Sequence, residues 1–119
     1  MKIETNLVHF SNGIDLECGV RLNSFDLMVE TYGELNNNKS NAVLVCHAFS
    51  GNHHAAGKLS NDDQVGWWDE IIGPNKAIDT NNYYVVCCNN LGGCSGSTGP
   101  ISINPVSYTH LTLPTSSVV

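Results

Sequence analysis

The sequence has few basic residues and lacks the long apolar runs of membrane proteins. Only five of its 119 residues are Lys or Arg, against eleven Asp or Glu, which gives a formal net charge of −6. Binding to nucleic acid or to an anionic membrane needs clustered basic residues, so neither is expected. No apolar run approaches the ~20 residues that span a bilayer, and Met1–His9 lacks the apolar segment of a signal peptide. A cytoplasmic protein is the simplest interpretation.

Charged residues of either sign are absent from the last part of the sequence, since none follows Asp79. The surface of a complete domain carries charged side chains throughout. An uncharged stretch is typical of a segment that a longer chain buries. We therefore expect the sequence to be part of a larger domain.

Cysteine is present, but in no pattern typical of a disulfide framework or a metal site. The five cysteines are an odd number and contain no C-x-x-C pair. Reduced, mostly buried thiols are expected in a cytosolic protein. Zinc held by cysteines with His47, His53 and His54 is the alternative. Neither the adjacent His53–His54 pair nor the gap between Cys87 and Cys94 has the spacing of structural zinc, so no metal site is predicted.

Two continuous apolar runs predict a pair of parallel strands. Ala42–Cys46 and Tyr83–Cys88 have the β-branched composition of strands that are buried on both faces. The stretch between them is long enough for the crossover that parallel pairing needs. Within it, Trp67–Ile72 is expected to form a turn or two of helix that ends at Gly73-Pro74, with the two tryptophans packed in the core.

The region before these runs predicts two short antiparallel-type strands. Apolar residues alternate with polar ones through Ile14–Glu34, first at Leu16, Cys18 and Val20 and again after the Asn23-Ser24 turn signal. The expected fold class is therefore α/β, with a hairpin-like start, parallel strands joined by a crossover, and an incomplete sheet.

A candidate site lies where the first apolar run ends, at His47-Ala48-Phe49-Ser50-Gly51. In α/β hydrolases the loop after the third strand directs one backbone N–H at the oxyanion of an acyl-transfer transition state. If this loop is the equivalent one, the donor is the backbone N–H of Phe49. A lone histidine is more often structural than catalytic, so His47, with Ser50 and Gly51, is expected to support the loop and to contribute to substrate binding.

The sequence contains no G-x-S-x-G pentapeptide, the turn that presents a serine nucleophile. The glycine-rich stretch Asn89–Pro100 follows the second apolar run, at the sheet edge where α/β proteins bind ligands. It lacks the lysine of a phosphate-binding loop and does not fit G-x-G-x-x-G, and its Ser95, Ser97 and Thr98 are expected to stabilise the loop. Cys94 has no later Asp and His to serve it as a nucleophile. No nucleophile, base or acid is therefore predicted in this chain.

Several strings carry a specific resemblance in both order and spacing. They are Tyr32–Asn36, Leu44–His54, Gly66–Asp69, Ile72–Pro74, Ile78–Thr80, Asn89–Pro100 and Ser102–Pro105. Together they resemble the homoserine O-acetyltransferase family, α/β-hydrolase-fold enzymes of methionine biosynthesis. The resemblance implies that residues 1–105 are the amino-terminal part of such a domain. It ends at Pro105, and Val106–Val119 resembles translated sequencing adapter, so residues 106–119 are expected to be an artefactual tail.

The resemblance implies a two-step acyl transfer. A serine takes acetyl from acetyl-CoA, and a histidine oriented by an aspartate then activates the hydroxyl of L-homoserine. It implies small-molecule substrates and no bound cofactor, and a homodimer is among the states that it allows for the full-length enzyme. The serine, aspartate and histidine are expected beyond this chain, so the 119 residues alone are expected to be inactive and poorly stable.

Two alternatives stay open. One is a related enzyme of the same fold that uses succinyl-CoA or accepts serine, because acyl-donor and acceptor specificity depends on pocket residues, most of which this sequence does not contain. The other is a short, non-catalytic binding protein, against which the charge-free last part argues.

Overall fold

The computed structural model describes residues 1–59, 64–93 and 95–98. Within these residues the chain forms strands and turns and no helix. The strands are β1 (Ile3–Phe10), β2 (Ile14–Asp15), β3 (Arg21–Leu22), β4 (Phe25–Tyr32), β5 (Ala42–Val45), β6 (Ile72–Gly73), β7 (Ile78–Asp79) and β8 (Tyr84–Cys88). The predicted boundary at Pro105 and the predicted tail lie outside the described residues.

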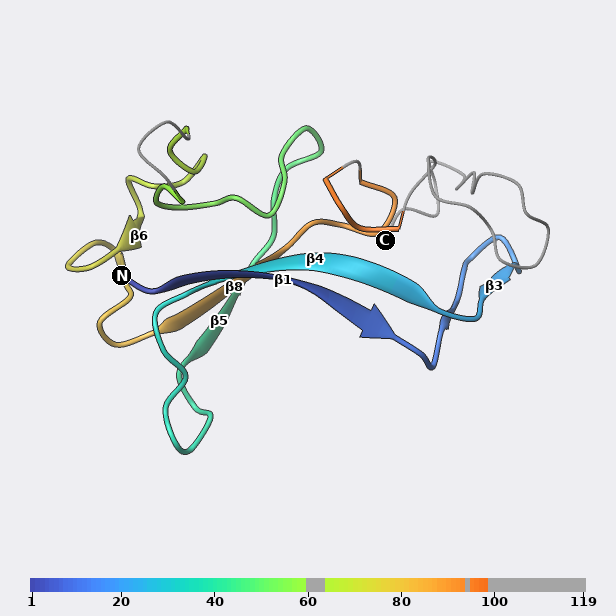
Figure 1. The fold of residues 1–119 in the computed structure, drawn as a ribbon, viewed down its shortest axis with the longest axis horizontal. Coiled ribbons are helices and arrows are strands. Elements are labelled where there is room, and N and C mark those ends of the chain that lie inside the picture. Colours follow the sequence, from blue (N-terminus) through green and yellow to red (C-terminus); the bar gives the residue numbers. More distant parts are fainter. Residues whose placement is uncertain (60–63, 94, 99–119) are drawn as a thin grey trace.

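Four strands form one mixed sheet in the order β1-β4-β8-β5 (Figure 1). β1 pairs with β4, and β4 with β8, in antiparallel register, whereas β5 and β8 are parallel, with Leu44 opposite Val86. An antiparallel start followed by a parallel pair is the predicted arrangement. Because β5 and β8 are parallel, the loops that follow them leave the sheet at the same edge.

Both strands predicted from the apolar runs are present, but only one is well buried. Val85 and Cys87 of β8 are completely buried, since β8 has a neighbour on each side. β5 is the last strand of the described sheet, and its Leu44 is 67% exposed. The expectation that β5 is buried on both faces is therefore wrong for this chain.

Near the amino terminus the sequence pattern predicts one strand correctly and one wrongly. β4 is present, but Leu16–Val20 is a tight turn in which the Leu16 N–H donates to the Val20 carbonyl at 2.9 Å and Gly19 has a φ of +88°. β1, which pairs with β4 along its whole length, was not predicted. Seven of its eight residues are exposed, so it carries little alternation of polar and apolar residues.

The predicted helix at Trp67–Ile72 is reduced to a single turn. The Ile72 N–H donates to the Trp68 carbonyl at 3.1 Å, and the chain then enters β6. The indole rings of Trp67 and Trp68 stack with their centroids 5.7 Å apart and are 43% and 39% exposed as residues. The expectation that both tryptophans pack in the core is therefore wrong for this chain.

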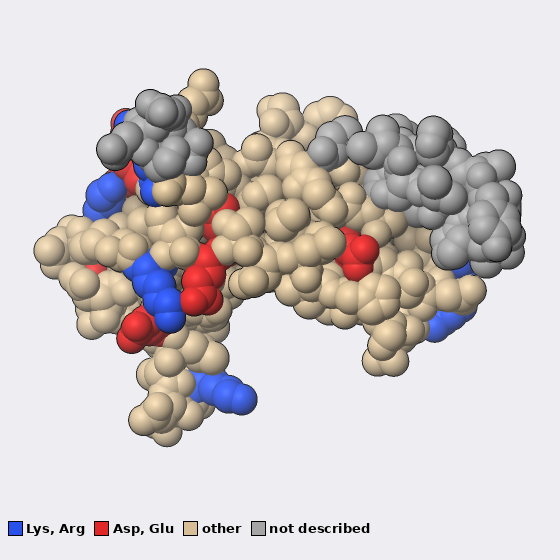
Figure 2. All heavy atoms as spheres, in the orientation of Figure 1, with Lys and Arg blue, Asp and Glu red and all other residues tan. Residues whose placement is uncertain are grey.

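The main core joins the sheet to the connection between β5 and β8. Its buried members are Tyr32, Val45, Val85 and Cys87 of the sheet with Ala55, Ala56 and Ile72 of the connection. In Figure 2 the Lys and Arg side chains on the face shown are scattered and form no basic patch. No helix in the described part of the chain is long and apolar enough to cross a bilayer.

Candidate functional site

The candidate loop His47–Gly51 follows β5 and lies beside the start of the glycine-rich loop that follows β8. The two loops are in direct contact, because the backbone N–H of Asn90 donates to Nε2 of His47 at 3.0 Å. Residues 43 positions apart in the sequence therefore meet at the carboxyl edge of the parallel pair. This is the edge at which open α/β sheets bind ligands.

The peptide between Ala48 and Phe49 is held through its carbonyl group. The Gly51 N–H donates to the Ala48 oxygen at 2.8 Å, which closes a β-turn, and Nδ1 of His47 lies 2.7 Å from the same oxygen. The described backbone contains no cis peptide, so the Phe49 N–H points away from the Ala48 carbonyl. Within the described residues this N–H has no acceptor. A backbone donor that is fixed and unused in this way can bind an oxyanion.

The other predicted site residues are placed as follows. The side chain of Phe49 is fully exposed, so only its backbone belongs to the loop structure. Ser50 is exposed at the tip of the turn. A Cβ atom at Gly51 would lie 3.1 Å from Cβ of His47 and 3.3 Å from the Ala48 oxygen, which is why the turn favours glycine.

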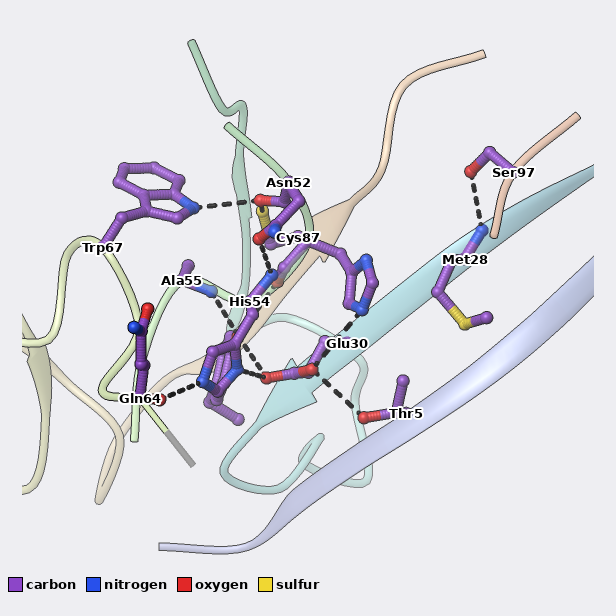
Figure 3. Close-up of polar contacts among 12 residues, drawn as sticks. Thr5, Met28, Glu30, Asn52, His54, Ala55, Gln64, Trp67, Cys87 and Ser97 are labelled. Atoms are coloured by element: carbon purple, nitrogen blue, oxygen red, sulfur yellow. Dashed lines mark hydrogen bonds and ion pairs between the residues drawn. The ribbon is translucent and has the colours of Figure 1, made fainter. Parts of the chain in front are cut away.

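The glycine-rich loop is tied back to β4 by hydroxyl groups. Ser97 Oγ accepts from the Met28 N–H at 2.9 Å (Figure 3) and donates to the Asn89 carbonyl at 2.6 Å. Thr98 Oγ1 accepts from the Asp26 N–H at 2.8 Å, and the Thr98 N–H donates to the Asp26 carbonyl at 2.8 Å. The predicted stabilising role is confirmed for Ser97 and Thr98, whereas the Ser95 hydroxyl makes no hydrogen bond to another described residue.

A buried carboxylate, that of Glu30 in β4, lies against the segment that follows the candidate loop. The sequence pattern did not predict it. The Glu30 side chain in β4 has no exposed surface. Its Oε1 accepts from the Tyr32 hydroxyl at 2.8 Å and lies 2.7 Å from Nδ1 of His54, and its Oε2 accepts from the Thr5 hydroxyl at 3.1 Å (Figure 3). The Ala55 N–H donates to the Tyr32 oxygen at 2.8 Å. Glu30 thus connects β1 and β4 to the segment that follows the candidate loop.

The two neighbouring histidines differ in their surroundings. Nδ1 of His54 faces the Glu30 carboxylate, and Nε2 lies 2.9 Å from the carbonyl of Gln64, so the imidazolium form satisfies both acceptors. Nε2 of His53 is 3.9 Å from Oε2 of Glu30, and its Nδ1 is buried without a hydrogen-bond partner. Burial lowers the pKa of His53, and the Glu30 charge opposes that shift. Burial also raises the pKa of the Tyr32 hydroxyl, which stays protonated.

The thiols of Cys87 and Cys88 in β8 are poor candidates for a nucleophile. Burial raises the pKa of Cys87 to about 12 and also raises the pKa of Cys88. Cys18 and Cys46 are exposed, contrary to the expectation of mostly buried thiols, and Cys94 lies outside the described residues. In the described part of the chain, no three His, Cys, Asp or Glu side chains are grouped so that they could hold a metal ion.

Comparison with known sequences finds relatives that are much longer than this chain. No protein-family model matches the chain. It is 60% identical over 106 residues to a homoserine O-succinyltransferase of Psychrobacter arcticus, covering 88% of the chain and 24% of the relative. It is 62% identical over 104 residues to the homoserine O-succinyltransferase of Hahella chejuensis, covering 87% and 27%. The chain thus spans about a quarter of the length of these curated relatives.

Solved structures share the fold. A homoserine O-acetyltransferase from Bacillus anthracis has a TM-score of 0.83 and 40% identity, with 92% of this chain and 31% of that chain covered. Esterase E22 has a TM-score of 0.81 and 37% identity over the same shares. These neighbours are α/β-hydrolase-fold proteins, so the predicted fold class is confirmed.

Proposed function

Because the chain is homologous to homoserine O-acyltransferases of the α/β-hydrolase fold, we propose that it supplies the oxyanion loop of such an enzyme. The proposal rests on the way in which the Ala48–Phe49 peptide is held. Its carbonyl is occupied by two donors, and its N–H has no acceptor among the described residues. His47 and Gly51 hold this peptide, and the exposed Ser50 lies beside it, where it can contact substrate.

The proposed reaction transfers an acyl group in two steps. The thioester C–S bond of the acyl-CoA breaks as a C–O bond forms to a serine, whose proton passes through a histidine to the departing thiolate. The hydroxyl of L-homoserine then attacks the acyl-serine and gives its proton, through the same histidine, to the released serine. In each step the carbonyl oxygen gains negative charge, which the Phe49 N–H stabilises. The serine, its histidine and its aspartate are not among the described residues.

Two acyl donors are supported to different degrees. The curated relatives are named O-succinyltransferases at about 60% identity, whereas the solved O-acetyltransferase is 40% identical. We therefore favour succinyl-CoA over the acetyl-CoA that the sequence resemblance implied. Both are substrates, and the proposal includes no bound cofactor.

A donor competition tests the proposal. The complete gene product is incubated with L-homoserine, or with L-serine, and equal concentrations of succinyl-CoA and acetyl-CoA, and the products are identified by mass spectrometry. We expect O-succinylhomoserine as the main product. Predominant O-acetylhomoserine would reverse the donor assignment, and the absence of any acylated amino acid would contradict the proposal. The 119-residue chain alone is expected to form none of these products, because it contains no G-x-S-x-G serine.

Ester hydrolysis is a second candidate, which the likeness to esterase E22 favours. A hydrolase uses the same oxyanion donor but transfers the acyl group to water. Hydrolysis of p-nitrophenyl acetate that is not suppressed by L-homoserine, together with no amino-acid acylation, would favour this candidate over the transferase.

A further inference from the structure

The ring of His47 makes two contacts that require one tautomer. The Asn90 N–H can only donate, so Nε2 of His47, at 3.0 Å, is the unprotonated acceptor. The ring proton of the neutral imidazole is then on Nδ1, which lies 2.7 Å from the Ala48 carbonyl oxygen, an acceptor. Both contacts are satisfied together only by the neutral Nδ1–H form.

Asn90 is itself held in a fixed position. Its neighbour Asn89 is buried, donates its N–H to the Met28 carbonyl at 2.8 Å and accepts from Ser97 Oγ at 2.6 Å. The Asn90 carbonyl accepts from the Gly93 N–H at 2.8 Å. The Asn90 N–H is therefore fixed relative to β4 and β8, and through it the ring of His47 is fixed as well.

From these contacts we infer that His47 is a positioning residue for the Phe49 N–H and that the Asn90 backbone selects its tautomer. The Nδ1–H of His47 and the Gly51 N–H together fix the direction of the Ala48 carbonyl. The trans peptide then fixes the Phe49 N–H in the opposite direction. The exposed Phe49 side chain has no packing that could do so. The inference rests on the proposed function, since it assigns a role within the same site.

The structural part is tested by NMR on the complete gene product. We expect a pyrrole-type ¹⁵N shift at Nδ1 of His47 and a pyridine-type shift at Nε2. His47→Ala should accelerate hydrogen exchange at the Gly51 and Asn90 amides, whereas His47→Asn, which keeps a donor near the δ position, should preserve protection at Gly51 alone. His9→Ala, which removes an exposed histidine on β1, is the control and should change neither amide. A proton on Nε2, or unchanged exchange in His47→Ala, would overturn the inference.

The kinetic part uses the complete gene product. His47→Ala should lower kcat for acyl transfer by about 10- to 100-fold, less than the complete loss of one oxyanion donor, with KM for the acyl-CoA nearly unchanged. His47→Asn should recover most of kcat. An active wild type whose His47→Ala variant keeps its kcat would overturn the inference alone. A wild type without acyl transfer would contradict the proposed function and, with it, this role, although the tautomer would still stand.

Discussion

Nδ1 of His54 lies 2.7 Å from Oε1 of Glu30, a carboxylate with no exposed surface. The two residues belong to β4 and to the segment that follows the candidate loop, 24 positions apart. A buried carboxylate is tolerated only where it is paired and hydrogen-bonded. Tyr32 and Thr5 supply the remaining hydrogen bonds. The pair therefore holds the connection after β5 against the sheet.

Glu30→Gln should destabilise the fold by about 2 kcal/mol or more, because it removes a buried charge that His54, Tyr32 and Thr5 all contact. The matched control is Glu4→Gln, in which an exposed partner of Lys2 is changed in the same way. The control should stay within about 0.5 kcal/mol of wild type. Urea denaturation measures both, and equal effects of the two variants would contradict the role of Glu30.

His53 makes stability depend on pH in a defined direction. Burial lowers its pKa in the folded chain below the ordinary value of 6.5. Below pH 6.5 the unfolded chain therefore takes up a proton that the folded chain resists, and the free energy of unfolding falls as the pH falls. His53→Gln should flatten this slope; the charged or titratable groups that face His53 are Glu30, His54 and His47. His9→Gln is the control; a slope that is unchanged in His53→Gln would refute the prediction.

Thiol labelling at pH 8 should separate the described cysteines. Cys18 and Cys46 are exposed and should react rapidly with iodoacetamide. Cys87 should resist until the chain is unfolded, because burial raises its pKa to about 12 and the thiolate is the reactive form. Peptide mapping by mass spectrometry identifies the labelled sites. Labelling of Cys87 at the rate of Cys46 in the folded chain would contradict the buried position of β8.

The outer edge of β5 should promote self-association of the 119-residue chain. Leu44 is 67% exposed on a strand that has no partner on one side among the described residues. An unpaired edge with apolar side chains pairs readily with another chain. Leu44→Lys should lower the apparent mass measured by light scattering at high concentration. Val20→Lys, in the exposed turn between β2 and β3, is the control; equal reduction by both variants would show a general charge effect instead.

The parallel pair was predictable because its signal is local. Ala42–Cys46 and Tyr83–Cys88 are continuous apolar runs, and parallel pairing brings the loops that follow them to one edge. The exposure of Leu44 was not predictable, since it depends on what lies beside β5. β1 was missed because seven of its eight residues are exposed, so its sequence carries little alternation of polar and apolar residues.

Part of the site was also predictable because its signal is local, and the rest was not because its contacts join distant positions. The loop His47–Gly51 is marked by its position after an apolar run. The partners of its neighbours come from distant positions: Asn90 lies 43 residues from His47, and Thr5 lies 25 residues from Glu30. A glutamate in a strand usually faces solvent, so nothing in the sequence around Glu30 indicates that it is buried.

The most direct test of the central claim removes the Phe49 N–H without removing the loop. Phe49 is the second residue of the Ala48–Gly51 turn, a position that proline favours, and proline has no N–H. In the complete gene product, Phe49→Pro should lower kcat for acyl transfer to homoserine by about 10²- to 10³-fold, whereas Phe49→Ala, which keeps the N–H, should stay within about 10-fold of wild type. A Phe49→Pro enzyme with the kcat of Phe49→Ala would contradict the claim that this backbone donor stabilises the oxyanion.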